Sequence, residues 1–199
     1  MGSRRVSKLA AADLMSLEQY ARERTAFRAR VLRHKSARQI AVGPNATWCF
    51  EDRLTVQYQV QEMLRAERIF EPAGIADELG AYNPLIPDGS NWKVTLLIEF
   101  ADPVERARAL ARLRGIEDRC WVQVAEYGRV LAVADEDLER ENADKTSAVH
   151  FLRFELDPRM IASLRAEASL ALGIDHEHYR HTVREVPAAV RRALSADFS

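Results

Sequence analysis

The chain has 199 residues, of which 47% are hydrophobic and 30% are charged, and its formal net charge is −1. This length and composition are typical of one folded domain, and they exclude a disordered chain or a polycation. No apolar run approaches the roughly 20 residues that cross a bilayer, and the N-terminus lacks the apolar core of a signal peptide. We therefore expect a cytoplasmic protein without membrane contact.

Charge is distributed unevenly along the chain. Residues 1–40 carry ten Lys and Arg against three acidic residues, a net charge of +7, which leaves −8 for the remainder. Opposite charges favour contact between these parts, either within one chain or across a homodimer. The basic residues alternate with acids and lack interleaved aromatic side chains, which argues against nucleic-acid binding. We divide the predicted single domain, 1–199, into a basic N-terminal helical segment at 1–37 and a sheet-containing body at 38–199.

The first elements of the chain are predicted to be helices and one hairpin. Ser16 has capping-box spacing, and the apolar residues after it recur on one face of a helix. Two short apolar runs, 38–42 and 47–50, surround a Gly-Pro-Asn turn and predict a β-hairpin. Residues 51–70 alternate like a strand in part, but their length and helix-forming composition favour a helix. A short helix is expected at 72–79.

Strands and helices are predicted to alternate in the rest of the chain. The clearest strand is 92–100, where every second residue is apolar. Asp102 and the proline after it start a helix that ends at Gly115. The remaining predicted elements are a hairpin of 120–125 and 129–134, an exposed acidic connection at 135–144, a strand at 149–156, a helix at 157–173, and a terminal helix after 187.

Hairpins mixed with helices, without a repeated β-α-β pattern, indicate an α+β fold. We predict a single domain in which one antiparallel sheet of hairpins packs against several helices. The sheet is expected to contain residues 92–100, 120–125 and 149–156. Helices are expected to cover its apolar face, which carries Val94, Leu96, Leu152 and Phe154.

The two cysteines, Cys49 and Cys120, each lie within an apolar strand-like run. We predict that both thiols are buried and reduced, as befits a cytoplasmic protein. The chain contains no G-x-G-x-x-G, no phosphate-binding loop, no G-x-S-x-G and no C-x-x-C motif. The sequence therefore indicates no cofactor-binding fingerprint, and it leaves open whether the protein is an enzyme.

Histidines form the most suggestive polar group. His176, His178 and His181 fall within six residues, and imidazoles at this spacing either bind a divalent metal or belong to a polar surface loop. His150 lies on the strand 149–156, on the face that should be buried. A buried imidazole must satisfy both ring nitrogens, so His150 is either a hydrogen-bonded core residue or a ligand.

Polar side chains also line one side of the helix at 51–70. Arg53, Gln57, Gln61 and Arg65 recur there at four-residue spacing, with Glu62 beside them. This pattern fits either a polar pocket that receives an anion or a solvated face stabilised by local ion pairs.

Several segments resemble the bacterial proteins grouped as domain of unknown function 3501 (DUF3501). They are Glu-Asp-Arg-Leu-Thr-Val-Gln-Tyr-Gln-Val-Gln-Glu-Met-Leu-Arg at 51–65, Asn-Pro-Leu-Ile-Pro-Asp-Gly at 83–89, Lys-Thr-Ser-Ala-Val-His-Phe-Leu-Arg-Phe at 145–154 and Ala-Leu-Gly-Ile-Asp-His at 171–176. The resemblance extends from about Val6 to the end of the chain. It implies no defined activity, although family members are often encoded beside rubrerythrin-like and iron–sulfur oxidoreductase-like proteins.

The resemblance also bears on the histidines. His150, His176 and Tyr179 match the pattern of the family, whereas His178 and His181 do not. The implied setting is iron or peroxide metabolism and oxidative stress.

Two functional hypotheses follow. The first is a metal-binding or redox-accessory protein in which His150 and His176 bind a divalent metal, Fe or Zn, and Glu62 completes the site. The second is a non-catalytic partner of a rubrerythrin-like or iron–sulfur oxidoreductase. Such a partner would dock through the loop around Asp88 or through the acidic segment 135–144.

Overall fold

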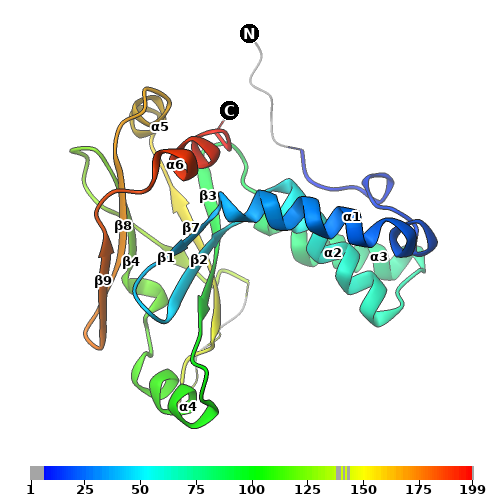
Figure 1. Cartoon of the computed structure of the whole chain (residues 1–199), viewed down its shortest axis with the longest axis horizontal. Coiled ribbons are helices and arrows are strands. Elements are labelled where there is room, and N and C mark those ends of the chain that lie inside the picture. The colour runs from blue at the N-terminus through cyan, green and yellow to red at the C-terminus, as the bar shows by residue number, and fades with distance from the viewer. Residues whose placement is uncertain (1–6, 138–139, 141, 143, 199) are drawn as a thin grey trace.

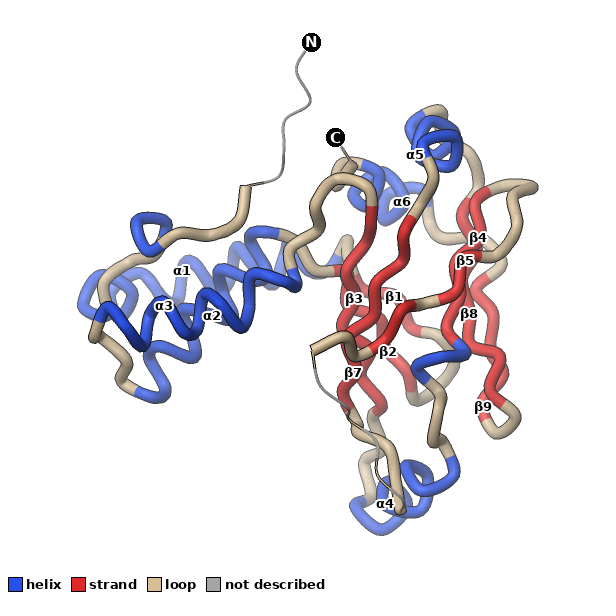
Figure 2. Tube along the Cα trace, turned by 180° about the vertical axis from the view of Figure 1, so that it is seen from behind, coloured by secondary structure: helices blue, strands red, loops and turns tan. Residues whose placement is uncertain are grey.

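The structure is a computed structural model, and it describes residues 7–137, 140, 142 and 144–198 (Figure 1). The fold is α+β, as predicted: two antiparallel sheets form a sandwich, and three helices project from one side of it (Figures 1 and 2). The helices are α1 (Leu17–Ser36), α2 (Arg53–Glu67), α3 (Pro72–Tyr82), α4 (Pro103–Arg112), α5 (Pro158–Arg165) and α6 (Ala188–Ser195). Short 3-10 helices are η1 (Ala11–Asp13), η2 (Asn83–Leu85) and η3 (Glu117–Arg119).

The first sheet has the strand order β1-β2-β3-β7-β6, and the second has the order β5-β4-β8-β9. All of their pairs are antiparallel. The strands of the first sheet are β1 (Gln39–Ala41), β2 (Ala46–Phe50), β3 (Asn91–Ile98), β6 (Val133–Ala134) and β7 (Val149–Glu155). Those of the second are β4 (Cys120–Val124), β5 (Val130–Leu131), β8 (Leu170–His176) and β9 (Tyr179–Val183).

The expectation of one sheet is therefore wrong for residues 120–124, which belong to the second sheet. Alternation shows which face of a strand is buried, but it does not show what covers that face. Val94 and Leu152 of the first sheet share one core cluster with Val122 and Leu172 of the second. The second sheet, rather than a layer of helices, covers the predicted apolar face, while α4 lies at one end of the sandwich and α5 and α6 at the other (Figure 2).

The predicted hairpin of 120–125 and 129–134 is divided between the sheets. Its first part pairs β4 with β5, with Trp121 opposite Leu131. The chain then crosses over at Ala132, and β6 pairs with β7 of the other sheet, with Val133 opposite Arg153. The first predicted hairpin is confirmed, with Ile40 opposite Trp48 in β1 and β2.

The predicted helix at 157–173 is wrong in its second half. α5 ends at Arg165, Glu167 has a φ of +62°, and residues 170–176 form β8. Gly173 is not the expected helix stop: it lies in β8, packed against Trp121 of β4. A Cβ at position 173 would lie 2.6 Å from Cζ2 of that indole, so close packing explains this glycine.

The three projecting helices form an arm with its own apolar contacts (Figure 1). α1 buries Tyr20, Phe27 and Val31, which pack against Leu54 and Tyr58 of α2. Another side of α2 packs on α3 in a separate apolar cluster. Asp52 caps α2 by accepting a hydrogen bond from the Thr55 backbone N–H, which confirms helix rather than strand in this segment.

Both cysteines are buried and unbonded to each other, and burial raises the pKa of both thiols. Within the described residues, no helix has the length and apolar character needed to cross a membrane. The acidic segment 135–144, expected to be an exposed connection, lies partly outside the described residues, at 138–139, 141 and 143.

Candidate metal centre

His150 lies in β7 and is completely buried, as the alternation of that strand predicts. Its neighbours Val149 and Phe151 point to the opposite side and are more exposed. A histidine inside an apolar sandwich needs polar partners at both ring nitrogens, because an unpaired buried polar atom costs roughly 1–3 kcal/mol. The groups beside the two ring nitrogens of His150 therefore decide whether the imidazole can bind a proton or a metal ion.

The Nδ1 side of the imidazole faces Asp135, and Nδ1 lies 2.6 Å from Asp135 Oδ2. Asp135 directly follows β6 and has a φ of +46°. Its other carboxylate oxygen accepts a hydrogen bond of 2.9 Å from the Phe151 backbone N–H, and it lies 3.2 Å from Arg140 Nη1. These contacts hold the carboxylate in place, so Asp135 fixes the orientation of the ring.

Oxygen atoms surround the Nε2 side. Thr146 Oγ1 lies 3.0 Å and the Ser147 carbonyl oxygen 3.1 Å from Nε2. Glu117 Oε2, from η3 just before β4, lies 3.7 Å from the same nitrogen. Three segments that are distant in sequence thus converge on one imidazole.

The surroundings of His150 shift its pKa in opposing directions. Burial lowers the pKa, but the hydrogen bond to Asp135 and the negative charges of Glu117 and Asp135 outweigh burial and raise it above its usual value. The cluster therefore favours a positive charge at its centre. That charge can be a proton on the imidazole or a metal cation bound to it.

The ligand atoms also lie close enough together to bind one ion. One atom each of Glu117, Asp135 and His150 falls within 4.8 Å of the others. Imidazole and carboxylate suit Zn²⁺ and Fe²⁺, and a histidine that binds metal through one nitrogen commonly donates its other N–H to a carboxylate. Asp135 accepts this hydrogen bond from Nδ1. Nε2 and the Glu117 carboxylate are then the two groups that can bind a metal ion.

His176 lies elsewhere in the fold, at the end of β8, and both of its nitrogens are engaged. Nε2 donates to the Arg114 carbonyl oxygen at 2.9 Å, and Nδ1 accepts from the His178 backbone N–H at 3.2 Å. These two contacts tie the imidazole to the Arg114 backbone and to the turn between β8 and β9. The histidine-rich segment is thus neither one strand nor one helix but a hairpin, with His181 on β9.

Glu62 lies on α2 within the arm. Its carboxylate accepts hydrogen bonds from Tyr20 Oη at 2.6 Å and from Arg24 Nε and Nη2, each at 2.7 Å. The hydrogen bond from Arg24, together with that from Tyr20, outweighs partial burial and lowers the pKa of Glu62 to about 2. The structure therefore places His150, His176 and Glu62 in three different contact networks.

The polar face of α2 binds the N-terminal segment. Arg53 forms an ion pair with Asp13 at 2.7 Å, and Gln57 donates to the Asp13 carbonyl oxygen at 2.7 Å. Arg65 Nε lies 3.8 Å from Glu62 Oε1. Arg53 and Gln57, which were candidates for lining a polar pocket, therefore attach the segment around η1 to α2.

Sequence reasoning missed Glu117 and Asp135. Asp135 was assigned to an exposed acidic connection, but its side chain is only 10% exposed and that of Glu117 only 11%. The available signal was that a buried histidine needs a carboxylate, and that an acid at the edge of a predicted strand can supply one. Nothing in the alternation of β7 identified which acids these would be.

The comparisons with known proteins assign no activity. A model of the family described as "Protein of unknown function (DUF3501)" matches residues 8–198. A crystal structure of a novel protein of unknown function from Burkholderia pseudomallei K96243 is 47% identical, with a TM-score of 0.92. The match covers 97% of this chain and 100% of that one. The search of curated proteins finds no match.

Proposed function

This chain belongs to the DUF3501 family, and we propose that it is a metal-binding protein whose centre comprises His150, Glu117 and Asp135. One observation carries the proposal. A completely buried imidazole is flanked by two nearly buried carboxylates, one near each ring nitrogen. In the proposed centre, Nε2 and Glu117 bind the ion and Asp135 orients the ring.

The chemistry of the donors favours Zn²⁺ or Fe²⁺. The hydroxyl of Thr146 and the carbonyl oxygen of Ser147 add neutral oxygen atoms beside Nε2. Mixed nitrogen and oxygen donors of this kind suit both cations better than soft, thiolate-selecting ions such as Cu⁺. An ion held by these residues would supply the positive charge that the two carboxylates favour, in place of an imidazole proton.

The burial of the donors favours an accessory role rather than turnover of a substrate. Catalytic metal sites keep a position open to water or substrate, whereas structural and storage sites are closed by protein. His150 is completely buried and Thr146 is 1% exposed. A redox-accessory function in iron or peroxide metabolism fits this closed site, and the genomic setting implied by the family resemblance supports it.

Metal analysis of the full chain, purified without an affinity tag, tests this proposal. We expect about one equivalent of Zn²⁺ or Fe²⁺ per chain, and we expect the His150→Gln and Glu117→Gln variants to lose it. If His150→Gln fails to fold, Glu117→Gln still decides the outcome, because that residue lies at the margin of the core. Retention of the metal in a folded Glu117→Gln variant contradicts the proposed ligand set.

Two matched variants examine the ligands first expected from sequence. His176→Gln removes a second buried histidine, and Glu62→Gln removes a paired carboxylate in the arm. We expect both variants to keep their metal, since their side chains have other partners. If these two lose the metal while Glu117→Gln retains it, His150, His176 and Glu62 are the better assignment.

The alternative function, docking onto a rubrerythrin-like or iron–sulfur oxidoreductase, has support from one surface. Leu131 and Val133 are 61% and 42% exposed beside the acidic segment that follows β6. Exposed apolar side chains bordered by charge are typical of protein interfaces. Leu131→Asp should abolish co-elution with a purified rubrerythrin-like protein without changing metal content, and unchanged co-elution contradicts this surface.

A further inference from the structure

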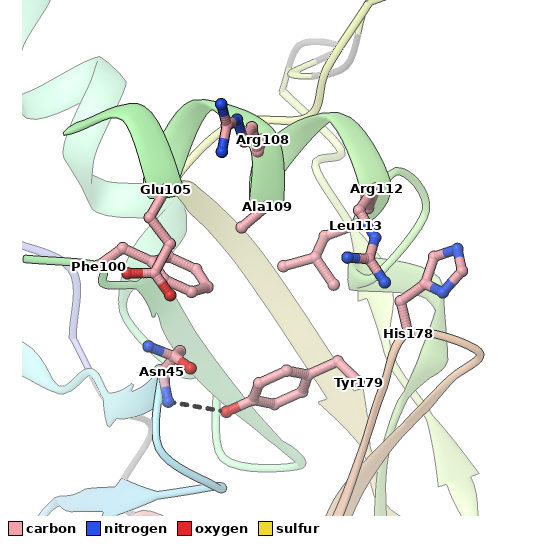
Figure 3. A pocket seen from close by; sticks show the side chains of 9 residues that line it. All are labelled: Asn45, Phe100, Glu105, Arg108, Ala109, Arg112, Leu113, His178 and Tyr179. Carbon is pink, nitrogen blue, oxygen red and sulfur yellow. Dashed lines mark hydrogen bonds between the residues drawn. The ribbon is translucent and has the colours of Figure 1, made fainter. Parts of the chain in front are cut away.

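A separate cavity of about 330 Å³ lies beneath α4. Its walls come from four places: α4 with the residue after it, the turn between β8 and β9, the turn between β1 and β2, and Phe100 after β3 (Figure 3). Binding sites for small molecules start at about this volume. The cavity shares no lining residue with the proposed metal centre.

The middle of the cavity is apolar and firmly built. Phe100, Ala109, Leu113 and Tyr179 line it, and both Leu113 and Tyr179 are largely buried. The Tyr179 hydroxyl accepts from the Asn45 backbone N–H at 2.9 Å and donates to the Val42 carbonyl oxygen at 2.8 Å. Since these contacts satisfy the hydroxyl, the phenol ring serves as a fixed wall.

The two ends of the cavity carry opposite charge. In Figure 3, Arg112 and His178 line one end, and the Glu105 carboxylate lies at the other, toward Asn45. Within the part of the chain that the structure describes, no carboxylate lies within ion-pair distance of Arg108 or Arg112. These two arginines are four residues apart on one helix, so they repel each other, and an anion nearby would relieve that repulsion.

We propose that this cavity binds a small monocarboxylate with an apolar body. Arg112 offers the N–H donors, because a guanidinium can donate two parallel hydrogen bonds to a carboxylate. His178 borders the same end, where its Nε2 lies 3.5 Å from Glu177 Oε1. The body of the ligand lies against Phe100, Leu113 and Tyr179. Glu105 at the far end repels a second anionic group, so the site selects monocarboxylates over dicarboxylates.

Titration of the full chain with hexanoate, followed by isothermal calorimetry or NMR, tests this site. We expect saturable binding, and we expect Arg112→Gln to weaken it about tenfold or more, because a charge-assisted hydrogen bond is lost. Arg106→Gln is the matched control. It removes an arginine from the same helix that is not among the described residues lining the cavity. Equal losses in both variants contradict the proposal.

Analogues of hexanoate test separately the need for a negative charge and the exclusion of a second carboxylate. Hexanamide, which lacks the charge, should not bind, and adipate should bind more weakly than hexanoate. Glu105→Gln should bring the affinities for adipate and hexanoate together, because it removes the repulsive charge. Binding of hexanamide as tight as that of hexanoate, or displacement of hexanoate by inorganic phosphate at equal concentration, overturns the carboxylate assignment.

Discussion

Asp135 contacts His150 through its side chain and Phe151 through its backbone, so one residue joins β6 to β7 and orients the buried imidazole. Its Oδ2 lies 2.6 Å from His150 Nδ1, while its backbone N–H donates to the Phe151 carbonyl oxygen at 2.8 Å. Asp135 has a left-handed backbone, with a φ of +46°, and its side chain is only 10% exposed. Because Asn also tolerates this conformation, the charge of Asp135 can be removed without changing the backbone.

Asp135→Asn should weaken Zn²⁺ binding by about 10- to 100-fold, the usual effect of losing a carboxylate that orients a metal-binding histidine. The measurement is calorimetric titration of Zn²⁺ into the metal-free protein. Asp137→Asn is the control, since Asp137 also pairs with Arg140 but has no described contact with His150. An affinity change of equal size in both variants would assign the effect to Arg140 rather than to the imidazole.

Gly43→Ala should lower the free energy of unfolding by about 1–3 kcal/mol. Gly43 has a φ of +79°, and a Cβ there would lie 2.5 Å from the His181 ring and 2.6 Å from the Tyr179 hydroxyl. Urea denaturation measures the change. Gly80→Ala is the matched control in α3, where no atom would meet the new methyl group, and it should leave stability unchanged or raise it.

The contacts of Glu62 should make the stability of the arm depend on pH. Its pKa is lowered from 4.5 to about 2 in the folded protein, so its contribution is present above 4.5 and is lost as pH falls through about 2. At neutral pH, Glu62→Gln should cost about 1 kcal/mol, as expected for a partly exposed ion pair. That difference from wild type should shrink on acidification, as measured by urea denaturation at several pH values.

Glu67→Gln serves as the control for the Glu62 prediction. Glu67 is an exposed acid at the end of the same helix. Its replacement should have little effect at any pH. A pH-independent loss in Glu62→Gln would mean that packing, rather than charge, accounts for the contribution of Glu62.

Both thiols should be inert in the native protein. Cys49 is 5% exposed and Cys120 is fully buried, and burial raises the pKa of each, which lowers the thiolate fraction available for reaction. A chromogenic disulfide reagent should label neither residue until denaturant is added. Rapid native labelling at Cys49 alone would show that β1 separates from β2 in solution.

The sequence predicted local features well and spatial neighbours poorly. Alternation in β7 correctly oriented His150 toward the core, and the Asp102-Pro103 signal correctly started α4. The partners of His150 come from segments whose position depends on how the chain passes between the sheets at Ala132. Periodicity carries no information about that crossing, so Glu117 was missed and residues 120–124 were assigned to the wrong sheet.

Glycine at position 173 gave the other misleading signal. A glycine after an apolar periodic run is typical of a helix end, and residues 157–173 were interpreted that way. The actual requirement at Gly173 is space for the Trp121 indole on the neighbouring strand. Such a requirement arises only from the tertiary structure. Because residues 170–176 form a strand and not a helix end, His176 and His178 lie at a hairpin turn and not in a loop after a helix.

The proposed centre holds a metal ion through His150, with oxygen donors around Nε2. X-ray absorption spectroscopy of the protein loaded with one equivalent of Zn²⁺ tests it most directly, because outer-shell scattering distinguishes imidazole ligands from carboxylate oxygen. We expect a single imidazole with oxygen ligands, and loss of the imidazole signal in His150→Gln. A spectrum with two or more imidazoles, or one that His150→Gln leaves unchanged, would contradict it.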